Sequence, residues 1–160
     1  MEFRQVYEEI APKLTNYLVG CGASYAEACD LVQETFVRVW KRRDELIDDE
    51  SQVRGFVFTV ARNLRRNLVR DRAHETLQPE IADAGSYETD FESKDEIAAL
   101  RKRLLAALAE LPPILRETFA LFQIAELSVR EIARQTETTE ANVKVRIHRA
   151  KEKLREKLKG

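Results

Sequence analysis

Hydrophobic positions recur at helical spacing along most of this chain. In its first half, three stretches place apolar or small side chains at steps of three and four residues, and this spacing predicts amphipathic helices. We expect them over about residues 3–20, from residue 25 to about 41, and from about 52 to 72. The three stripes are Val6, Ile10, Leu14, Tyr17 and Leu18; Leu31, Val32, Thr35, Phe36, Val39 and Trp40; and Val53, Phe56, Val57, Val60, Leu64 and Leu68.

Capping patterns predict where these helices begin and end. Gly20 and Gly22 end the first stretch, and Ser24 followed by Glu27 forms a capping-box pattern that starts the second. Ser51 is the expected cap of the third. Trp40 and Phe56 lie on apolar stripes, so we expect both in the core.

The second half has the same character. A capping-box pattern over 93–96 precedes a stripe that ends before Pro112 and Pro113, after which a new helix begins. Its apolar positions are Leu115, Phe119 and Phe122. The stripe before the prolines comprises Ile97, Leu100, Leu104, Leu105, Leu108 and Leu111.

A helix-turn-helix follows. Ser128 and Glu131 form another capping-box pattern before a short helix, and residues 136–138 form a polar turn. Thr139 is the expected cap of a helix running from Glu140 to about Leu158. A short helix, a three-residue turn and a longer helix are typical of a DNA-binding helix-turn-helix.

Composition excludes several classes of protein. The chain has 160 residues, of which 34% are charged, with only 5 Gly and 4 Pro, so it is unlike a disordered or collagen-like chain. No apolar run approaches the roughly 18 residues of a membrane span, and the N-terminus shows no apolar signal core, so we expect a cytoplasmic protein. Cys21 and Cys29 are too few for a disulfide framework, and we expect buried or bystander thiols.

The net charge of −1 is the sum of segments whose opposite charges cancel. Residues 1–75 carry −1, residues 76–95 carry −5, and residues 96–160 carry +5. The middle segment shows no helical period, so we expect a flexible acidic linker between two small helical domains, 1–75 and 96–160, in an all-α fold. It is either a solvated spacer or a negative segment that occupies a basic channel on a partner.

Two helix surfaces are strongly basic. Residues 54–72 carry +5 and include Asn63 and Asn67, while residues 141–160 carry +6. Arg and Lys neutralise phosphates, and Asn offers both a donor and an acceptor to a base edge. Phe58 lies off the apolar stripe and is the better candidate for stacking on a base. The alternative is that both basic surfaces are simply charged helix faces exposed to solvent, with no ligand.

In the last helix, the outward positions near its start favour DNA contact. N-terminal residues of such a helix meet base edges in the major groove. The candidates are Lys144, Val145, Arg146, His148 and Arg149. Beyond Lys151 we expect alternating, solvated charges.

Four motifs, in order, resemble sigma-70-family transcription initiation factors. The segment 30–40 resembles their core-binding helix, and 56–63 resembles their promoter-melting helix. Leu111 to Pro113 followed by 127–133 and 143–150 resembles their C-terminal promoter-reading module. The short two-module layout matches the extracytoplasmic-function (ECF) group.

The resemblance implies roles for particular residues. Asp30, Gln33 and Glu34 match positions that dock on the RNA polymerase core. Arg62, Asn63, Arg66 and Asn67 match the helix that contacts the −10 element, and 48–53 matches a loop that completes a base pocket there. Lys144, Val145, His148 and Arg149 match positions reading the −35 element, and Arg146 is expected to contact a phosphate there. The linker matches a segment that threads polymerase channels.

The partners implied are core RNA polymerase, promoter DNA and an anti-sigma factor. We expect no enzymatic chemistry, metal or cofactor. Two alternatives stay open from the residues: a free-standing helix-turn-helix repressor or activator, and a protein-binding helical adaptor. One departure is Glu137, which stands in the turn where the family usually has glycine. Because glycine permits a left-handed backbone, Glu137 puts the turn geometry in question.

Overall fold

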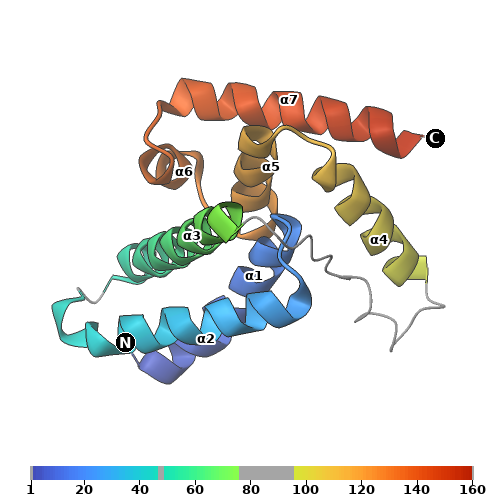
Figure 1. The fold of residues 1–160 in the computed structure, drawn as a ribbon. Helices are drawn as coiled ribbons and strands as arrows, with labels where there is room; N and C mark the ends of the chain where they lie inside the picture. The colour runs from blue at the N-terminus through green and yellow to red at the C-terminus, as the bar shows by residue number, and fades with distance from the viewer. Residues whose placement is uncertain (1, 47–48, 76–95, 160) are drawn as a thin grey trace. The chain divides into compact units, whose positions relative to one another are not determined.

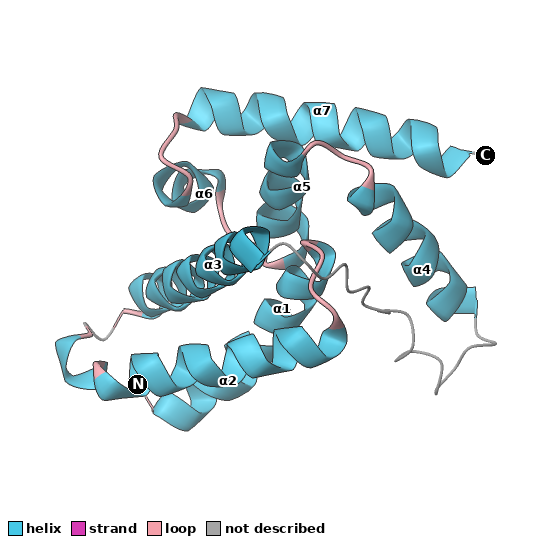
Figure 2. Cartoon of the chain, viewed as in Figure 1, coloured by secondary structure: helices cyan, strands magenta, loops and turns pink. Residues whose placement is uncertain are grey.

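The computed structural model describes residues 2–46, 49–75 and 96–159, and every regular element in these ranges is helical (Figures 1 and 2). The predicted linker, 76–95, lies outside the described residues. Two compact units emerge: the first holds the described residues of Met1–Thr15 and Ser24–Ala84, and the second those of Asn16–Ala23 and Gly85–Gly160. None of the described helices is long and apolar enough to cross a membrane.

The first unit is built from three long helices. They are α1 (Phe3–Gly20), whose last turn belongs to the second unit, α2 (Tyr25–Lys41) and α3 (Glu50–Glu75). A single 3₁₀ turn, η1 (Arg43–Glu45), follows α2, and α2 packs along α3. The helices predicted from the hydrophobic period are therefore confirmed in position and approximate length.

Caps define the starts of α2 and α3. The Ser24 hydroxyl accepts a hydrogen bond from the Glu27 amide over 3.1 Å, as the sequence predicts. The prediction for α3 is wrong by two residues. Asp49 precedes the helix and its carboxylate accepts from the Ser51 amide over 3.0 Å, so Ser51 is already inside the helix. Asp49 satisfies one of the amides that the first turn leaves without a partner.

The core of the first unit differs from the predicted stripe on α3. Phe58 is fully buried, whereas Phe56 is only half-buried. Trp40, expected in the core, is 45% exposed. All three long helices supply buried apolar side chains to this unit: Val6, Ile10, Leu14, Leu31, Val32, Phe36, Val39, Val53, Val57, Phe58 and Ala61.

The second unit contains the remaining helices. They are α4 (Glu96–Ala109), α5 (Pro113–Phe119), the π-helical turn η4 (Ala120–Ile124), α6 (Val129–Gln135) and α7 (Glu140–Lys159). Within this unit, α7 packs against α4, α5 and α6, as Figure 1 shows.

Burial in the second unit is uneven along α4. Its C-terminal half supplies Ala107 and Leu108 to the core, but Ile97 and Leu100, placed on the same predicted stripe, are 74% and 59% exposed. The apolar stripe of α4 therefore extends beyond the surface that the unit covers. The central cluster consists of Ala107, Leu108, Leu111, Leu115, Phe119, Ala150 and Leu154.

Candidate nucleic-acid and protein interfaces

Helix α7 presents the predicted base-reading residues on its outer surface. Val143, Ile147 and Ala150 are buried, and they set the rotation of the helix about its axis. Lys144, Val145, His148 and Arg149 are exposed as a result, and Arg146 is half-buried. The Thr139 hydroxyl caps the helix by accepting from the Asn142 amide over 3.1 Å, which confirms the predicted cap.

The turn before α7 has the geometry that a glycine would favour, although no glycine is present. Glu137 adopts a left-handed backbone with φ 55°. The Thr138 amide donates to the Ala133 carbonyl over 3.0 Å, and the Glu137 amide donates to the Arg134 carbonyl over 3.4 Å. This pair of bonds is a Schellman motif, which ordinarily places Gly at the left-handed position. Glu137 therefore keeps the turn, in a conformation that L-residues disfavour.

Helix α6 is fixed to this turn by its own cap. The Ser128 hydroxyl accepts from the Glu131 amide over 3.0 Å, and the Glu131 carboxylate accepts from the Ser128 amide over 2.9 Å. The predicted capping box is confirmed. Arg130 and Arg134 are exposed on this helix. The first helix of a helix-turn-helix crosses the DNA backbone, so both are candidate phosphate contacts that the sequence analysis missed.

The far end of α7 makes contacts within the unit. The Lys157 ammonium donates to Glu110 over 2.9 Å, and the Arg103 guanidinium donates to the Leu158 carbonyl over 2.9 Å. The second bond connects α4 with α7, and the first joins α7 to Glu110, the residue that follows α4. The ion pair with Glu110 gives the charge of Lys157 a partner within the unit.

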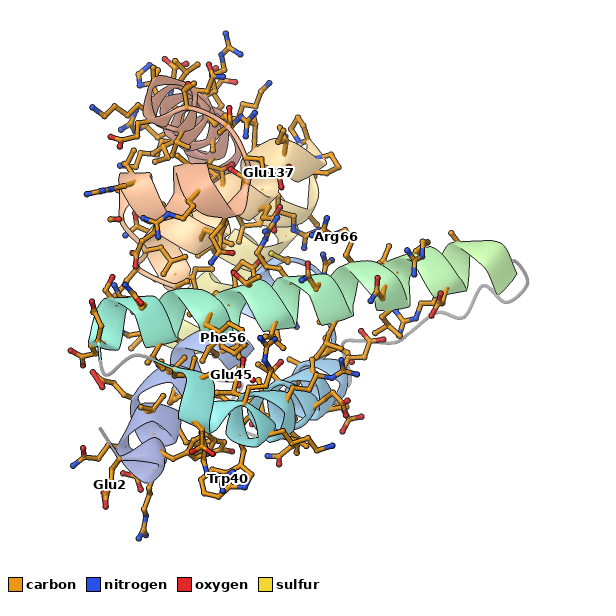
Figure 3. All side chains as sticks on the ribbon, turned by 90° about the vertical axis from the view of Figure 1, so that its left-hand side faces the viewer. Glu2, Trp40, Glu45, Phe56, Arg66 and Glu137 are labelled. Atoms are coloured by element: carbon orange, nitrogen blue, oxygen red, sulfur yellow. The ribbon has the colours of Figure 1, made fainter. Side chains whose placement is uncertain are left out.

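Helix α3 carries the second basic surface. Asn63, Arg66 and Asn67 are exposed, and Arg62 is half-buried. The Arg66 guanidinium donates to the Asn63 side-chain oxygen over 2.9 Å. The structure therefore brings two of the predicted −10 residues into direct contact, and Figure 3 shows Arg66 on the side of α3 turned away from α2.

The predicted stacking role of Phe58 is wrong in this structure. Its side chain is 0% exposed, so its ring has no face available to a base. Phe56 occupies the partly exposed position instead, with the Arg42 guanidinium 5.3 Å from its ring centroid. The predicted loop 48–53 is described only from Asp49 onward, and its residues from Glu50 to Val53 form the first turn of α3 rather than a loop. Asp49 and Glu50 are exposed.

Helix α2 displays the predicted polymerase-docking residues. Asp30, Gln33 and Glu34 are all exposed. Two of them are held by neighbours: the Gln33 amide donates to the Tyr7 hydroxyl over 3.2 Å, and Glu34 pairs with Arg38 over 3.1 Å. The predicted docking residues are therefore partly held in place by neighbours within the chain.

The same face of α2 also contains apolar surface. Val37 is 48% exposed and follows Gln33 and Glu34 by four and three residues, so it lies beside both on the helix. Trp40 lies one turn further on, and Figure 3 shows it at the end of α2. Both residues fall in the segment 30–40 that resembles the core-binding helix, although Trp40 was expected in the core.

Trp40 is held in place by an aromatic and cationic neighbourhood. The Phe3 ring meets it edge to face at 4.8 Å between centroids, and the Arg43 guanidinium lies 3.7 Å from its ring centroid. Arg43 also donates to the Trp40 carbonyl over 2.8 Å. These contacts limit the motion of a large side chain that is nearly half exposed.

An apolar groove of about 590 Å³ lies in the second unit. Leu104, Phe119, Leu154 and Leu158 supply its apolar lining. Its other lining residues are Gln123, Lys151, Arg155 and Lys159. An apolar groove with cationic side chains suits an amphipathic protein segment that carries acidic residues.

The two cysteines are free thiols that differ in burial. Cys21 is buried, as expected, and Cys29 is half-buried. A hydrogen bond with Cys29, and secondarily the negative charge of the Cys29 thiolate, raise the pKa of Tyr25 above its usual value of 10.0. No group of three or more His, Cys, Asp or Glu able to hold a metal is found in the part of the chain that the structure describes.

Two protein-family models match this chain. Residues 6–75 match the family model of sigma-70 region 2, and residues 101–154 match the model of sigma-70 region 4. The chain therefore belongs to the sigma-70 family of transcription initiation factors, which are not enzymes.

Relatives that match along most of their length show which group of sigma factors the chain belongs to. The ECF RNA polymerase sigma factor SigL of Mycobacterium tuberculosis is 31% identical over 155 residues, covering 95% of this chain and 86% of the relative. The ECF sigma factor RpoE of Cereibacter sphaeroides is 28% identical, covering 96% and 84%. The chain is an ECF sigma factor that directs transcription initiation through regions 2 and 4.

Solved structures share the fold. The sigma factor RpoE of Bartonella quintana, co-crystallised with the anti-sigma factor NepR, superposes with a TM-score of 0.75 at 23% identity, covering 98% of this chain and 96% of that one. CnrH in complex with the cytosolic domain of CnrY gives a TM-score of 0.68 at 24% identity, covering 95% and 84%.

Proposed function

We propose that each of the two basic surfaces binds a different element of the promoter. The exposed face of α3, with Arg62, Asn63, Arg66 and Asn67, binds the −10 element and stabilises its opened strand. The exposed start of α7, from Lys144 to Arg149, lies in the major groove of the −35 element. The exposed face of α2, with Asp30, Gln33 and Glu34, docks on core RNA polymerase.

One observation carries the DNA-reading part of this proposal. The helix-turn-helix within the region 4 match is capped at both helices and closed by a Schellman turn, so α7 is presented in a defined orientation. Its core residues face inward and its cationic residues face outward. That arrangement suits direct readout: Lys144 and Arg149 can donate to guanine O6 and N7 or to phosphate, and Val145 can touch a thymine methyl.

Docking on polymerase is supported by the composition of the α2 face. Stable interfaces combine an apolar centre with a polar rim, and Trp and Arg are enriched among the residues that dominate binding energy. Val37 and Trp40 supply exposed apolar surface among Gln33, Glu34 and Arg38. Trp40 is already restrained by Arg43, so its ordering costs little on binding.

Promoter melting on this proposal needs no covalent step. Opening a base pair costs a few kcal/mol in lost stacking and pairing. Hydrogen bonds to bases and ionic contacts to phosphates on α3 offset that cost by binding the opened strand. Neutralised phosphates also make the affinity fall with rising salt.

Regulation by an anti-sigma factor is part of the proposal. The apolar groove with Lys151, Arg155 and Lys159 provides a surface for an amphipathic protein segment, and it lies within the region 4 match apart from its last residues. The relatives of known structure were solved with such partners, which supports the idea by analogy. The site of action we propose is the cytoplasm, where core polymerase and promoter DNA are found.

Run-off transcription with purified core polymerase tests the proposal. The wild-type protein is expected to give promoter-dependent products from native templates. Lys144→Ala with Arg149→Ala is expected to reduce them and to remove protection over the −35 element. Lys153→Ala, also exposed on α7 but beyond the predicted contact region, is the matched control. An unchanged footprint in the double variant would refute the assignment of α7.

A pull-down with core polymerase tests the docking face separately. Trp40→Ala and Asp30→Ala with Glu34→Ala are expected to weaken polymerase binding. The truncation of a dominant interface residue typically lowers affinity by a factor of about 30 or more. Val69→Ala is the control, because Val69 is similarly exposed but lies on α3. Equal retention of all variants by the polymerase would contradict the docking assignment.

A further inference from the structure

In the hydrogen bond between Arg66 and Asn63, Arg66 is the donor and Asn63 is the acceptor. Arg66 Nη2 donates to Asn63 Oδ1 over 2.9 Å. The two residues are three positions apart on α3, so the helix itself holds their side chains side by side. Both are exposed, and Arg66 lies on the side of α3 turned away from α2 (Figure 3).

A guanidinium group determines which end of the amide it contacts. Arginine has N–H donors and no acceptor, so only the carboxamide oxygen of Asn63 can face Arg66. The amide nitrogen, with two donor hydrogens, is then left for other partners. Within the described residues, the bond from Arg66 is the hydrogen bond that the Asn63 side chain makes.

We propose that Arg66 is a positioning residue that presents Asn63 to the −10 strand as a hydrogen-bond donor. The inference rests on the proposed contact of α3 with that strand. An unrestrained Asn can turn its amide over, and it can use both ends at once to bind adenine N6 and N7. Asn63 is restrained: a base that donates to Oδ1 would have to share that oxygen with the Arg66 cation.

The shared oxygen should therefore weaken the two-bond contact with adenine N6 and N7. The free N–H groups of Asn63 can still donate to a carbonyl oxygen or a ring nitrogen, and every base offers such an acceptor, so the expected result is a weaker preference for adenine at the contacted position. The remaining N–H groups of Arg66 are available to a phosphate of the same strand. Arg66 would then hold a phosphate of the DNA strand and the Asn63 amide at once, so the position of the strand and the orientation of the amide would be fixed together.

A promoter library randomised over the −10 element tests the inference. Run-off products are sequenced after transcription with core polymerase and each variant. Arg66→Ala frees the Asn63 oxygen, so it should select adenine at one position more often than the wild type does, by about threefold to tenfold, the range for one hydrogen bond. Arg66→Lys keeps a donor-only cation at the same place and should retain most of the wild-type base preference.

Two further variants separate positioning from charge. Arg70→Ala removes one exposed positive charge from the same helix one turn further on, so it should lower the yield without changing the base preference. Asn63→Asp replaces the donor by an acceptor-only carboxylate, and its preference should move toward the amino groups of adenine or cytosine. Circular dichroism verifies that each variant keeps its helix content.

The outcomes distinguish this inference from the function on which it rests. Promoter-dependent products whose base preference is the same for Arg66→Ala and Arg70→Ala would overturn the positioning role alone. A shift toward adenine in Arg66→Lys as large as that in Arg66→Ala would also count against it. No promoter-dependent product from the wild-type protein would overturn the proposed function and this inference together.

Discussion

Glu137, in the turn between α6 and α7, has a left-handed backbone, and replacing it tests whether strain at this residue limits the stability of the turn. Glu137 has φ 55°, a conformation that costs an L-residue about 1–2 kcal/mol and costs glycine nothing. Glu137→Gly removes this strain and keeps both turn hydrogen bonds, which use backbone atoms. The greater freedom of glycine in the unfolded chain offsets about 0.5–1 kcal/mol of the gain.

The expected net effect is therefore a stabilisation of about 0.5–1 kcal/mol, confined to the second unit. For a domain of 60–100 residues this corresponds to a rise in Tm of about 2–8 °C. The chain has one tryptophan, Trp40, which lies in the first unit. Tryptophan fluorescence therefore follows the first unit, while amide hydrogen exchange in α6 and α7 follows the second. Glu137→Gly should slow exchange in those two helices.

The control is Glu137→Ala, which removes the same charge but keeps a Cβ atom in the left-handed conformation. It should give no gain in protection. If Glu137→Gly leaves exchange in α6 and α7 unchanged, or if Glu137→Ala protects them equally, strain at this residue is not what limits the stability of the turn.

Other substitutions test separate parts of the structure. Gly55→Ala in α3 should stabilise the first unit by about 0.5–1 kcal/mol in urea unfolding, because a Cβ there meets no atom within 4 Å; a loss of stability would contradict that open space. Ser128→Ala should cost about 1 kcal/mol by removing the cap of α6, measured as a lower Tm; an unchanged Tm would count against the cap. Phe58→Ala should cost about 3–5 kcal/mol because the ring is fully buried, and a near-neutral effect would restore the stacking prediction. Lys144→Ala with Arg149→Ala should reduce the slope of log affinity against log salt by about 2 if both residues contact phosphate; an unchanged slope would limit them to contacts with bases.

The sequence determined the local structure well because local rules govern it. Hydrophobic period and capping patterns depend on neighbours within a few positions, and they placed α1, α2, α6 and α7 close to their observed bounds. The same rules predicted the Ser128 capping box and the Thr139 cap, and both are present. The order of the motifs along the chain was sufficient to identify the family.

The candidate site was predicted in outline for the same reason. A cationic residue opposite a buried stripe must face outward, so the predicted residues at the start of α7 are exposed or, in the case of Arg146, half-buried. Contacts between individual side chains could not be predicted from the sequence, because side-chain geometry decides them. The bond from Arg66 to Asn63 and the packing of Arg43 on Trp40 both depend on it.

The tertiary structure alone decided which aromatic side chains are covered. Phe56 and Phe58 flank Val57 on opposite sides, about 100° away in each direction around the helix, so an apolar stripe centred on Val57 can include either. Burial of Val53, Val57, Phe58 and Ala61 shows that the helices of the first unit cover the side that carries Phe58. Trp40 and Ile97 illustrate the same limit, since each continues an apolar stripe past the surface that its neighbours cover. Periodicity states which residues share a face, but only the packing of other helices against that face determines how far burial extends.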